Sequence, residues 1–193
     1  MFEPPACAVH VSREVDAQDV LEVYERLRNG SHPWLLDSAL RVRKLGRFSF
    51  AGADPYLILR VRGREIELDC RRAVHPGLAL GRSSIEASAL DGIRSLLPSP
   101  PSTSPPVPFA GGAVGYFGYE LAQQFDAHVL RARDDLELPD ALLLFVDSLL
   151  AFDHETHKCF ALGLGFGEDE VAARANAQIA LQQLETRLAD RIG

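Results

Sequence analysis

The stretch from Phe109 to Glu120 constrains the fold most strongly, because its four glycines are interleaved with aromatic residues. It follows directly after the most proline-rich part of the chain. Glycine has no Cβ, so it lets a backbone approach another backbone or a ligand closely. We predict a short, buried, glycine-interrupted strand that turns into a helix near Tyr119, with Leu121, Ala122 and Phe125 on the inner side of that helix.

A phosphate-binding loop is the functional alternative for this stretch. Neither G-x-G-x-x-G nor G-x-x-x-x-G-K-[ST] occurs in it, and no Lys, Ser or Thr follows at the required place. Close packing of a strand against another layer is therefore favoured, and a nucleotide site is not expected.

Composition narrows the class of protein. The 193 residues suffice for one substantial domain or two small ones that share a core. A hydrophobic fraction of 47% and a charged fraction of 24% are typical of a soluble globular protein. The net charge of −7 argues against nucleic acid or an anionic membrane as a partner. No apolar run reaches the ~20 residues that span a bilayer, and no secretory signal is recognised.

The three cysteines, Cys7, Cys70 and Cys159, are far apart and form no CxxC pair. Reduced thiols in the cytoplasm are the natural interpretation. Buried strand cysteines are favoured over a catalytic cysteine, which stays an alternative.

Hydrophobic periodicity predicts mostly strands with about three helices. The expected strands are 6–11, 33–38, 45–55, 56–62, 65–70, 141–153 and 158–165, and the expected helices are 16–28, 85–97 and 168–191. We expect an N-cap at Asp16, a turn at Gly63, and a helix start at Ser83 or Ser84. The last helix has an apolar stripe that includes Val171, Ala175, Leu181, Leu184, Leu188 and Ile192.

Residues 98–108 contain six prolines in eleven positions. This composition predicts an extended, mobile connector that cannot join the interior of a sheet. Recognition of the segment by a polyproline-binding partner is the less favoured alternative.

Two short polar groupings are candidate sites. Asp37 and Ser38 end an apolar strand, where such residues either close a turn or hold a small ligand, and turn chemistry is favoured. Arg47 lies between Gly46 and Phe48, where it either binds a carboxylate through two hydrogen bonds or is simply an exposed strand position.

A metal site is not favoured. His154 and His157 lie in a predicted hairpin turn, where they do not converge as they would on a helix, and no third ligand is evident. Solvated turn residues are the better interpretation, with zinc as the alternative. No carboxylate cluster suited to Mg²⁺ is recognised.

Four segments, in this order and spacing, resemble the N-terminal region of component I of anthranilate synthase and aminodeoxychorismate (para-aminobenzoate) synthase. The resemblance covers nearly the whole chain, and the proline-rich connector is a local addition. The four segments are Trp34-Leu35-Leu36-Asp37-Ser38-Ala39, the run from Gly46-Arg47-Phe48-Ser49-Phe50 to Asp54-Pro55, the run from Gly111-Gly112 to Gly115-Tyr116-Phe117-Gly118-Tyr119-Glu120, and Leu138-Pro139-Asp140 followed by Phe152-Asp153-His154.

The resemblance implies an α+β fold of mainly antiparallel, β-sandwich-like sheets. Residues 1–97 would form a first part, 98–108 a linker and 109–193 a second part. It also implies a tryptophan pocket, which in the family begins at Leu-Leu-Glu-Ser and continues along a second wall. The ligand residues implied here are Leu36, Asp37, Ser38, Leu45, Gly46, Arg47 and Phe48.

The family's chorismate, Mg²⁺ and acid–base residues belong to a C-terminal domain that this sequence does not contain. We therefore expect no catalytic residue, no metal ligand and no cofactor in this chain. The implied partners are a C-terminal chorismate-binding domain or subunit and a glutamine amidotransferase subunit. Aspartate in place of the motif's glutamate, with the Gly-Tyr-Phe-Gly-Tyr-Glu run, favours the aminodeoxychorismate branch. Anthranilate synthase and a free-standing amino-acid-binding module are the alternatives.

Overall fold

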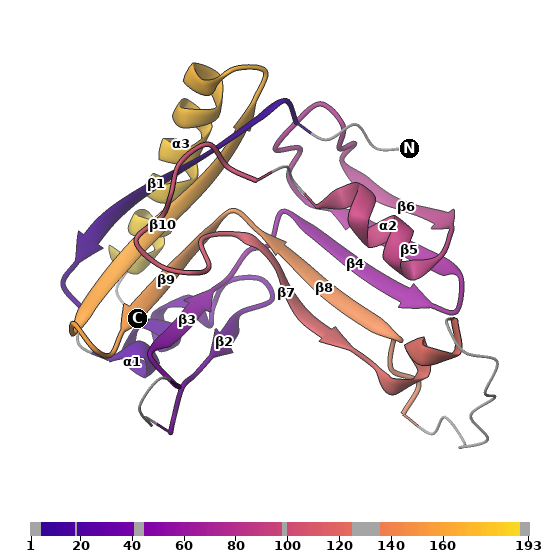
Figure 1. Cartoon of the computed structure of the whole chain (residues 1–193), viewed down its shortest axis with the longest axis horizontal. Helices are drawn as coiled ribbons and strands as arrows, with labels where there is room; N and C mark the ends of the chain where they lie inside the picture. Colours follow the sequence, from indigo (N-terminus) through magenta and orange to yellow (C-terminus); the bar gives the residue numbers. More distant parts are fainter. Residues whose placement is uncertain (1–4, 18, 41–44, 98–99, 125–135, 190–193) are drawn as a thin grey trace. The chain divides into compact units, whose positions relative to one another are not determined.

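The computed structural model divides the chain into two compact units, each assembled from segments that are distant in sequence. The larger unit comprises Pro5–Pro55, Pro98–Gly112 and Val146–Gly193, and the smaller one comprises Tyr56–Leu97 and Ala113–Phe145. Each unit has its own five-stranded sheet (Figure 1). The structure describes residues 5–17, 19–40, 45–97, 100–124 and 136–189.

The sheet of the larger unit has the strand order β1-β10-β9-β3-β2, and its neighbouring strands pair antiparallel. Two of its interior strands, β10 and β9, come from the last third of the sequence, while β3 and both edge strands come from the first third. The strands are β1 (Cys7–Val15), β2 (Trp34–Leu36), β3 (Phe48–Gly52), β9 (Ser148–Asp153) and β10 (Lys158–Gly167).

Two helices pack on one face of this sheet. The helix α1 (Val20–Leu27) begins at Asp19, whose carboxylate accepts a hydrogen bond from the Leu21 N–H at 2.9 Å. The N-cap is therefore Asp19 and not the predicted Asp16. The helix α3 (Glu170–Ala189) runs along β10. Between helices and sheet lies the core of Val20, Val23, Leu27, Ala51, Ala53, Leu150, Phe152, Cys159, Ala161, Leu181 and Leu184.

Glycines on β10 allow α3 to approach the sheet at backbone distance. A Cβ at Gly163 or Gly165 would overlap backbone atoms of α3, and one at Gly167 would lie 2.5 Å from the Ala173 nitrogen. The helix has alanines where it meets these glycines. Its buried residues are Ala173, Ala177, Ala180, Leu181 and Leu184. The predicted stripe is thus right at Leu181 and Leu184 and wrong at Val171 and Ala175, which are exposed; Ile192 lies outside the described residues.

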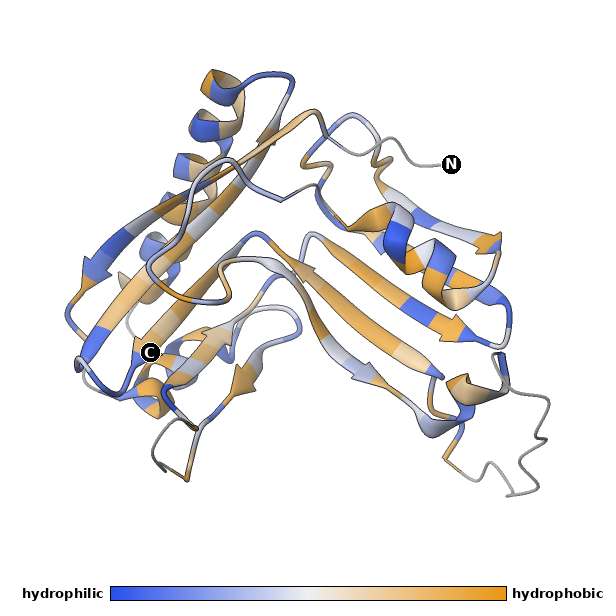
Figure 2. Cartoon of the chain, in the orientation of Figure 1, coloured by the Kyte–Doolittle hydropathy of each residue, from blue (hydrophilic) through white to orange (hydrophobic). Residues whose placement is uncertain are grey.

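The sheet of the smaller unit has the order β6-β5-β4-β8-β7. The hairpin of β4 and β5 turns at Gly63, whose φ of +55° favours glycine, so the predicted turn is confirmed. Figure 2 shows β8 as continuously hydrophobic, in keeping with an interior strand between β4 and β7. The strands are β4 (Leu57–Arg62), β5 (Glu65–Cys70), β6 (Gly81–Glu86), β7 (Gly112–Phe117) and β8 (Ala141–Val146).

The helix predicted over 85–97 is partly wrong. Ser84 and Ile85 belong to β6, where Ile85 pairs with Ile66, and the helix α2 is confined to Ala89–Leu96. Its N-cap is Ser88, whose hydroxyl accepts a hydrogen bond from the Asp91 N–H at 3.3 Å. Ser83 and Ser84 have the same capping side chain as Ser88, so the local sequence does not distinguish them as helix starts. Their pairing with β5 places them in a strand instead.

The glycine-rich stretch also departs from prediction. It forms β7 and then a 3₁₀ helix, η1 (Tyr119–Gln124), so the turn into a helix near Tyr119 is confirmed. The strand lies at the edge of its sheet, however, and Tyr116 and Phe117 are exposed. Leu121 is buried as predicted and Ala122 is exposed, while Phe125 lies outside the described residues.

The segment 141–153 is two strands and not one. β8 ends at Val146 in the smaller unit's sheet, and β9 begins at Ser148 in the larger unit's sheet. Asp147 separates them, and its carbonyl accepts a hydrogen bond from the Leu164 N–H at 2.7 Å. The boundary between the two strands was not predicted, because both are largely buried and the sequence is apolar on either side of Asp147.

The predicted α+β class, with mainly antiparallel sheets and about three helices, is confirmed by these elements. Among the described residues, no helix is both long enough and apolar enough to cross a bilayer.

Replacing Gly165 with alanine is expected to destabilise the larger unit by about 1–3 kcal/mol, because the added methyl overlaps backbone atoms of Ala173 and Ala177 that no rotamer change can move. Urea unfolding followed by far-UV circular dichroism measures the loss. Gln178→Ala, on the exposed side of α3, is the control and should change stability by less than about 0.5 kcal/mol. Equal effects for the two variants would contradict the proposed packing.

Candidate functional site

Asp37 and Ser38 follow β2 directly and are held against β3. The Ser38 hydroxyl donates to the Phe48 carbonyl at 2.6 Å, and the Ser38 N–H donates to the Ser49 hydroxyl at 3.0 Å. These two bonds continue the pairing of β2 with β3 beyond Leu36 through side-chain atoms. The pair therefore has a fixed position on the sheet.

The Ser49 hydroxyl is the centre of a buried network. Ser49 is fully buried; its hydroxyl donates to Asp37 Oδ1 at 3.0 Å and lies 2.8 Å from His154 Nε2. A hydroxyl has one proton and two acceptor positions. Asp37 takes the proton, and the Ser38 N–H occupies one acceptor position. His154 must therefore donate from Nε2, which assigns a proton to that nitrogen.

Arg47 binds Asp153 through two hydrogen bonds. Nε lies 3.0 Å from Oδ1 and Nη2 lies 2.7 Å from Oδ2, while Nη1 forms an ion pair with Glu155 at 3.0 Å. The guanidinium carbon also lies 4.8 Å from the centre of the Phe48 ring, within cation–π range. The bidentate alternative for Arg47 is therefore confirmed, with the carboxylate supplied by the end of β9.

The Asp153 carboxylate is ionised in the folded chain. Its side chain is 5% exposed, and Oδ1 also accepts hydrogen bonds from the Glu155 and Thr156 N–H groups at 3.0 and 3.4 Å. The hydrogen bonds from Arg47 are the main reason that the pKa of Asp153 lies far below its usual value, and they outweigh the opposing effect of burial. Asp153 thus fixes both Arg47 and the β9–β10 turn.

The other implied ligand residues differ in exposure. Leu36 and Leu45 are exposed, at 47% and 70%, whereas Phe48 is half-buried and stacks on Phe50. Gly46 has a φ of +70°, in the left-handed region. The structure thus brings Asp37, Ser38 and Phe48 into direct contact through the backbone of β3, and leaves the two leucines as apolar surface beside them.

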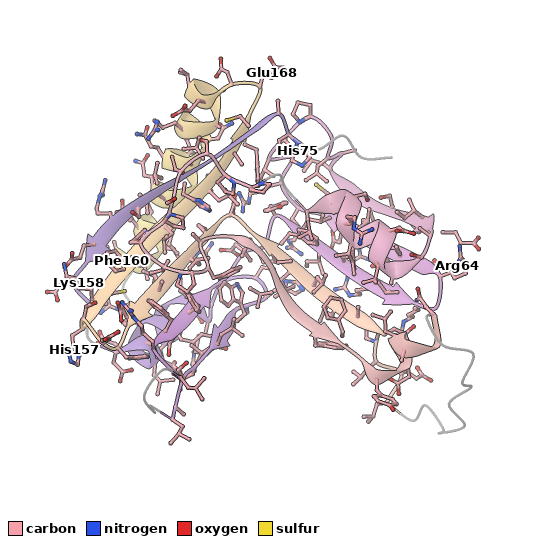
Figure 3. All side chains as sticks on the ribbon, in the orientation of Figure 1. Arg64, His75, His157, Lys158, Phe160 and Glu168 are labelled. Atoms are coloured by element: carbon pink, nitrogen blue, oxygen red, sulfur yellow. The ribbon has the colours of Figure 1, made fainter. Side chains whose placement is uncertain are left out.

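A cavity of about 590 Å³ adjoins this network in the larger unit. Asp153 and His154 border it, but none of the seven implied ligand residues does. His157 and Lys158, labelled in Figure 3, lie at the same end of the sheet. The lining residues are Glu14, Val15, Asp16, Ala17, Phe152, Asp153, His154, His157, Lys158 and Cys159.

The two histidines of the predicted turn have different surroundings. His154 hydrogen-bonds Ser49, and exposed His157 has a φ of +57° at the start of β10. Within the described ranges, no group of three or more His, Cys, Asp and Glu side chains is placed to hold a metal ion.

Two of the three cysteines are buried, Cys70 and Cys159, and Cys7 is half-buried. Burial raises the pKa of the Cys159 thiol to about 12, because the core disfavours the thiolate. The prediction of buried strand cysteines is confirmed at these two positions.

Ser49, Asp153 and His154 are members of the network that sequence reasoning did not assign to it. Alternation along β3 places Ser49 on the same buried face as Ala51. A hydroxyl at a buried strand position needs hydrogen-bond partners, and this was the one signal in the sequence that could have indicated the network. The partners of that hydroxyl are set by the pairing of β3 with β9, which joins residues about a hundred positions apart in the chain.

The architecture is that of an α+β domain found in component I synthases. The structure of anthranilate synthase component I from Streptococcus pneumoniae superposes with a TM-score of 0.53 at 18% identity, over 90% of this chain and 35% of that one. No family model matches the chain.

Sequence comparison leads to the same enzymes. Anthranilate synthase component 1 of Mycobacterium bovis is 36% identical over 152 residues, which cover 76% of this chain and 28% of that protein. Aminodeoxychorismate synthase of Streptomyces griseus is 32% identical over 160 residues, covering 79% and 20%. Aminodeoxychorismate synthase component 1 of Salmonella typhimurium is 32% identical over 129 residues, covering 64% and 26%.

This chain is homologous to the N-terminal region of component I of anthranilate synthase and aminodeoxychorismate synthase. It spans only about a fifth to a third of the length of the curated relatives it matches. Both kinds of synthase match at similar identity, so the homology is to the two together.

Arg47→Gln is expected to raise the pKa of Asp153 toward its ordinary value, since the two strongest hydrogen bonds to its ionised form are lost. A carboxyl whose pKa is lowered by folding stabilises the fold above its unfolded pKa, and this contribution is lost as the pH falls through that range. The unfolding free energy of the variant should therefore depend less on pH between about 5 and 2 than that of the parent protein. Urea titrations at stepped pH measure this dependence.

The control is Arg60→Gln, which removes an ion pair at 3.3 Å with Glu67, a carboxylate that is much more exposed than Asp153. Exposed pairs contribute little to stability, so its pH profile should follow that of the parent protein. An unchanged profile for the Arg47 variant would contradict the role assigned to Asp153.

Proposed function

We propose that this chain is the N-terminal scaffold and ligand-pocket domain of aminodeoxychorismate synthase component I. The observation that carries the proposal is the fixed Asp37–Ser38 pair, which stands where the family's Leu-Leu-Glu-Ser motif begins its tryptophan pocket. Both side chains are held by β3 through Phe48 and Ser49.

The hydrogen bonds of this pair define what it can recognise. The proton of the Ser38 hydroxyl is committed to the Phe48 carbonyl, so Oγ offers only lone pairs to a ligand. Asp37 accepts the Ser49 proton at Oδ1 and keeps acceptor capacity at Oδ2. Two acceptors side by side suit an ammonium group, so the pair would bind the amino end of an amino acid.

The apolar part of the ligand would lie on the second wall. Phe48 provides a half-buried ring and exposed Leu45 an aliphatic surface, which together suit an indole. Arg47 is already bound by Asp153 and Glu155, so in this proposal it orients the Phe48 ring and does not neutralise the ligand carboxylate.

Aspartate at position 37 supports the aminodeoxychorismate branch. Its side chain is one methylene shorter than the glutamate of the motif, and Oδ1 is tied to Ser49. A short, tethered carboxylate suits a ligand that is part of the structure better than a feedback inhibitor that must bind and leave. The anthranilate branch, in which tryptophan inhibits, is the alternative.

In this proposal the chemistry belongs to a C-terminal chorismate-binding domain or subunit, with Mg²⁺ held there. That domain would replace the chorismate hydroxyl with ammonia delivered by a glutamine amidotransferase subunit. This chain would supply the scaffold, a share of the amidotransferase interface and the pocket. No residue of the described network is assigned a step in the reaction.

L-Tryptophan should raise the melting temperature of this protein and slow amide exchange at residues 36–38 and 45–48, because the ligand binds the folded state alone. Ser38→Ala should weaken binding about 10-fold, since it removes one hydrogen bond to a charged group. Isothermal titration calorimetry gives the dissociation constants.

Ser12→Ala, which changes an exposed hydroxyl on β1, is the matched control and should bind as the parent protein does. If tryptophan changes neither the melting temperature nor amide exchange at these positions, the pocket assignment is wrong.

The branch is tested in the cells that make this protein. An antibody to this domain should detect an endogenous polypeptide heavier than 21.2 kDa or a complex with a separate catalytic subunit. Given chorismate, Mg²⁺ and glutamine, the purified assembly should form aminodeoxychorismate. Formation of anthranilate instead, with inhibition by tryptophan, would place the protein in the other branch, and a lone 21.2 kDa chain that binds amino acids without any synthase activity would favour a free-standing binding module.

A further inference from the structure

The two edges of the larger unit's sheet are unequal. β2 has only three residues, whereas β1 has nine. β1 pairs with β10 on one side, and its other side faces no further strand of this sheet. Short edge strands are self-protecting, but a long edge offers a row of N–H and C=O groups to any other strand. Since His10 turns its N–H outward, alternation along the strand places the outward groups on the even-numbered residues of β1.

Two residues of the proline-rich segment occupy the first half of this edge. The Ser102 N–H donates to the Ala8 carbonyl at 3.0 Å. The Thr103 hydroxyl accepts from the His10 N–H at 2.8 Å and donates to the His10 carbonyl at 3.3 Å. One hydroxyl thus satisfies both outward groups of His10, as the backbone of a neighbouring strand would. The predicted mobile connector is, over these residues, fixed to β1.

The sequence around Ser102 and Thr103 prevents this contact from extending into a sixth strand. Pro100 and Pro101 precede the two residues, and Pro105 and Pro106 follow them closely. Proline has no N–H, so it cannot continue a hydrogen-bonded ladder in either direction. The segment therefore covers the edge without creating a new one.

Charged residues mark the second half of β1. Arg13 pairs with Glu185 of α3 at 2.7 Å, and Glu14 pairs with Lys158 of β10 at 2.8 Å. Charges on an edge strand disfavour pairing with another strand. The stretch from Ala8 to Ser12 lacks such charges, and the segment bonds to Ala8 and His10 within it.

We propose that residues 100–108, anchored by Ser102 and Thr103, guard the β1 edge against antiparallel pairing with a second copy of this chain. A second copy is the natural occupant because two identical strands pair antiparallel about a two-fold axis, which closes the assembly at a dimer. With the axis at His10, Ala8 of one copy lies opposite Ser12 of the other, so the pairing stays within the stretch of β1 that carries no Arg, Lys, Asp or Glu. Release of the segment exposes this edge.

Thr103→Val tests the guard, because valine keeps the shape of threonine and removes both hydrogen bonds to His10. Exchange of the His10 amide, followed by NMR at low micromolar concentration, should become about 10-fold faster. At higher concentration, sedimentation velocity should show a dimer that the parent protein does not form under the same conditions. Thr103→Ser, which keeps the hydroxyl, should restore the parent behaviour.

Ser104→Ala is the matched control. Its hydroxyl is exposed and has no hydrogen-bond partner among the described residues, so neither exchange nor sedimentation should change. Should the Thr103 variant fail to fold, Ser102→Pro gives an independent test, since it removes the N–H and the hydroxyl that both donate to the Ala8 carbonyl and leaves Thr103 in place.

The double variant Thr103→Val with Ser12→Pro identifies the surface. Proline at Ser12 removes an outward N–H of β1, so pairing at this edge is blocked and the dimer should disappear. Faster His10 exchange without self-association would overturn the guard, and unchanged His10 exchange would overturn the contact itself. A dimer that persists in the double variant would overturn the assignment of the edge.

Discussion

The close approach of α3 to β10 is the contact on which the larger unit depends. Alternate residues of β10 that face the helix are glycines, and the helix presents alanine at the same level, so two backbones meet where side chains normally intervene. This brings Leu181 and Leu184 down onto the core shared with α1 and β3. Any larger residue at either surface lifts the helix away from the sheet and uncovers that core.

The same sheet order positions the candidate site. β9 lies between β10 and β3, so the end of β9 and its turn stand beside the start of β3 and the segment that follows β2. Asp153 and His154 therefore reach Arg47 and Ser49. The site is built from side chains that hold one another through hydrogen bonds and ion pairs.

Sequence patterns predicted the features that neighbouring residues determine, and missed those that depend on pairing between distant strands. The β4–β5 hairpin was predictable because alternation and a glycine at positive φ coincide at Gly63. The start of α2 was not, since Ser84 and Ser88 are equivalent as caps and only the pairing of β6 with β5 distinguishes them. In the site, the two-bond geometry of Arg47 was foreseen as an option, but its partner Asp153 is 106 residues away and could be identified only from the pairing of β3 with β9.

The proline-rich segment shows why composition alone misjudges a loop. Six prolines in eleven residues exclude it from a sheet interior, which the structure respects, yet its Ser102 and Thr103 supply the polar groups that an exposed strand edge requires. A segment unable to form a ladder is well suited to end one. The prolines and the hydroxyl thus act together, since the hydroxyl satisfies the edge and the prolines ensure that no further strand can add to the segment itself.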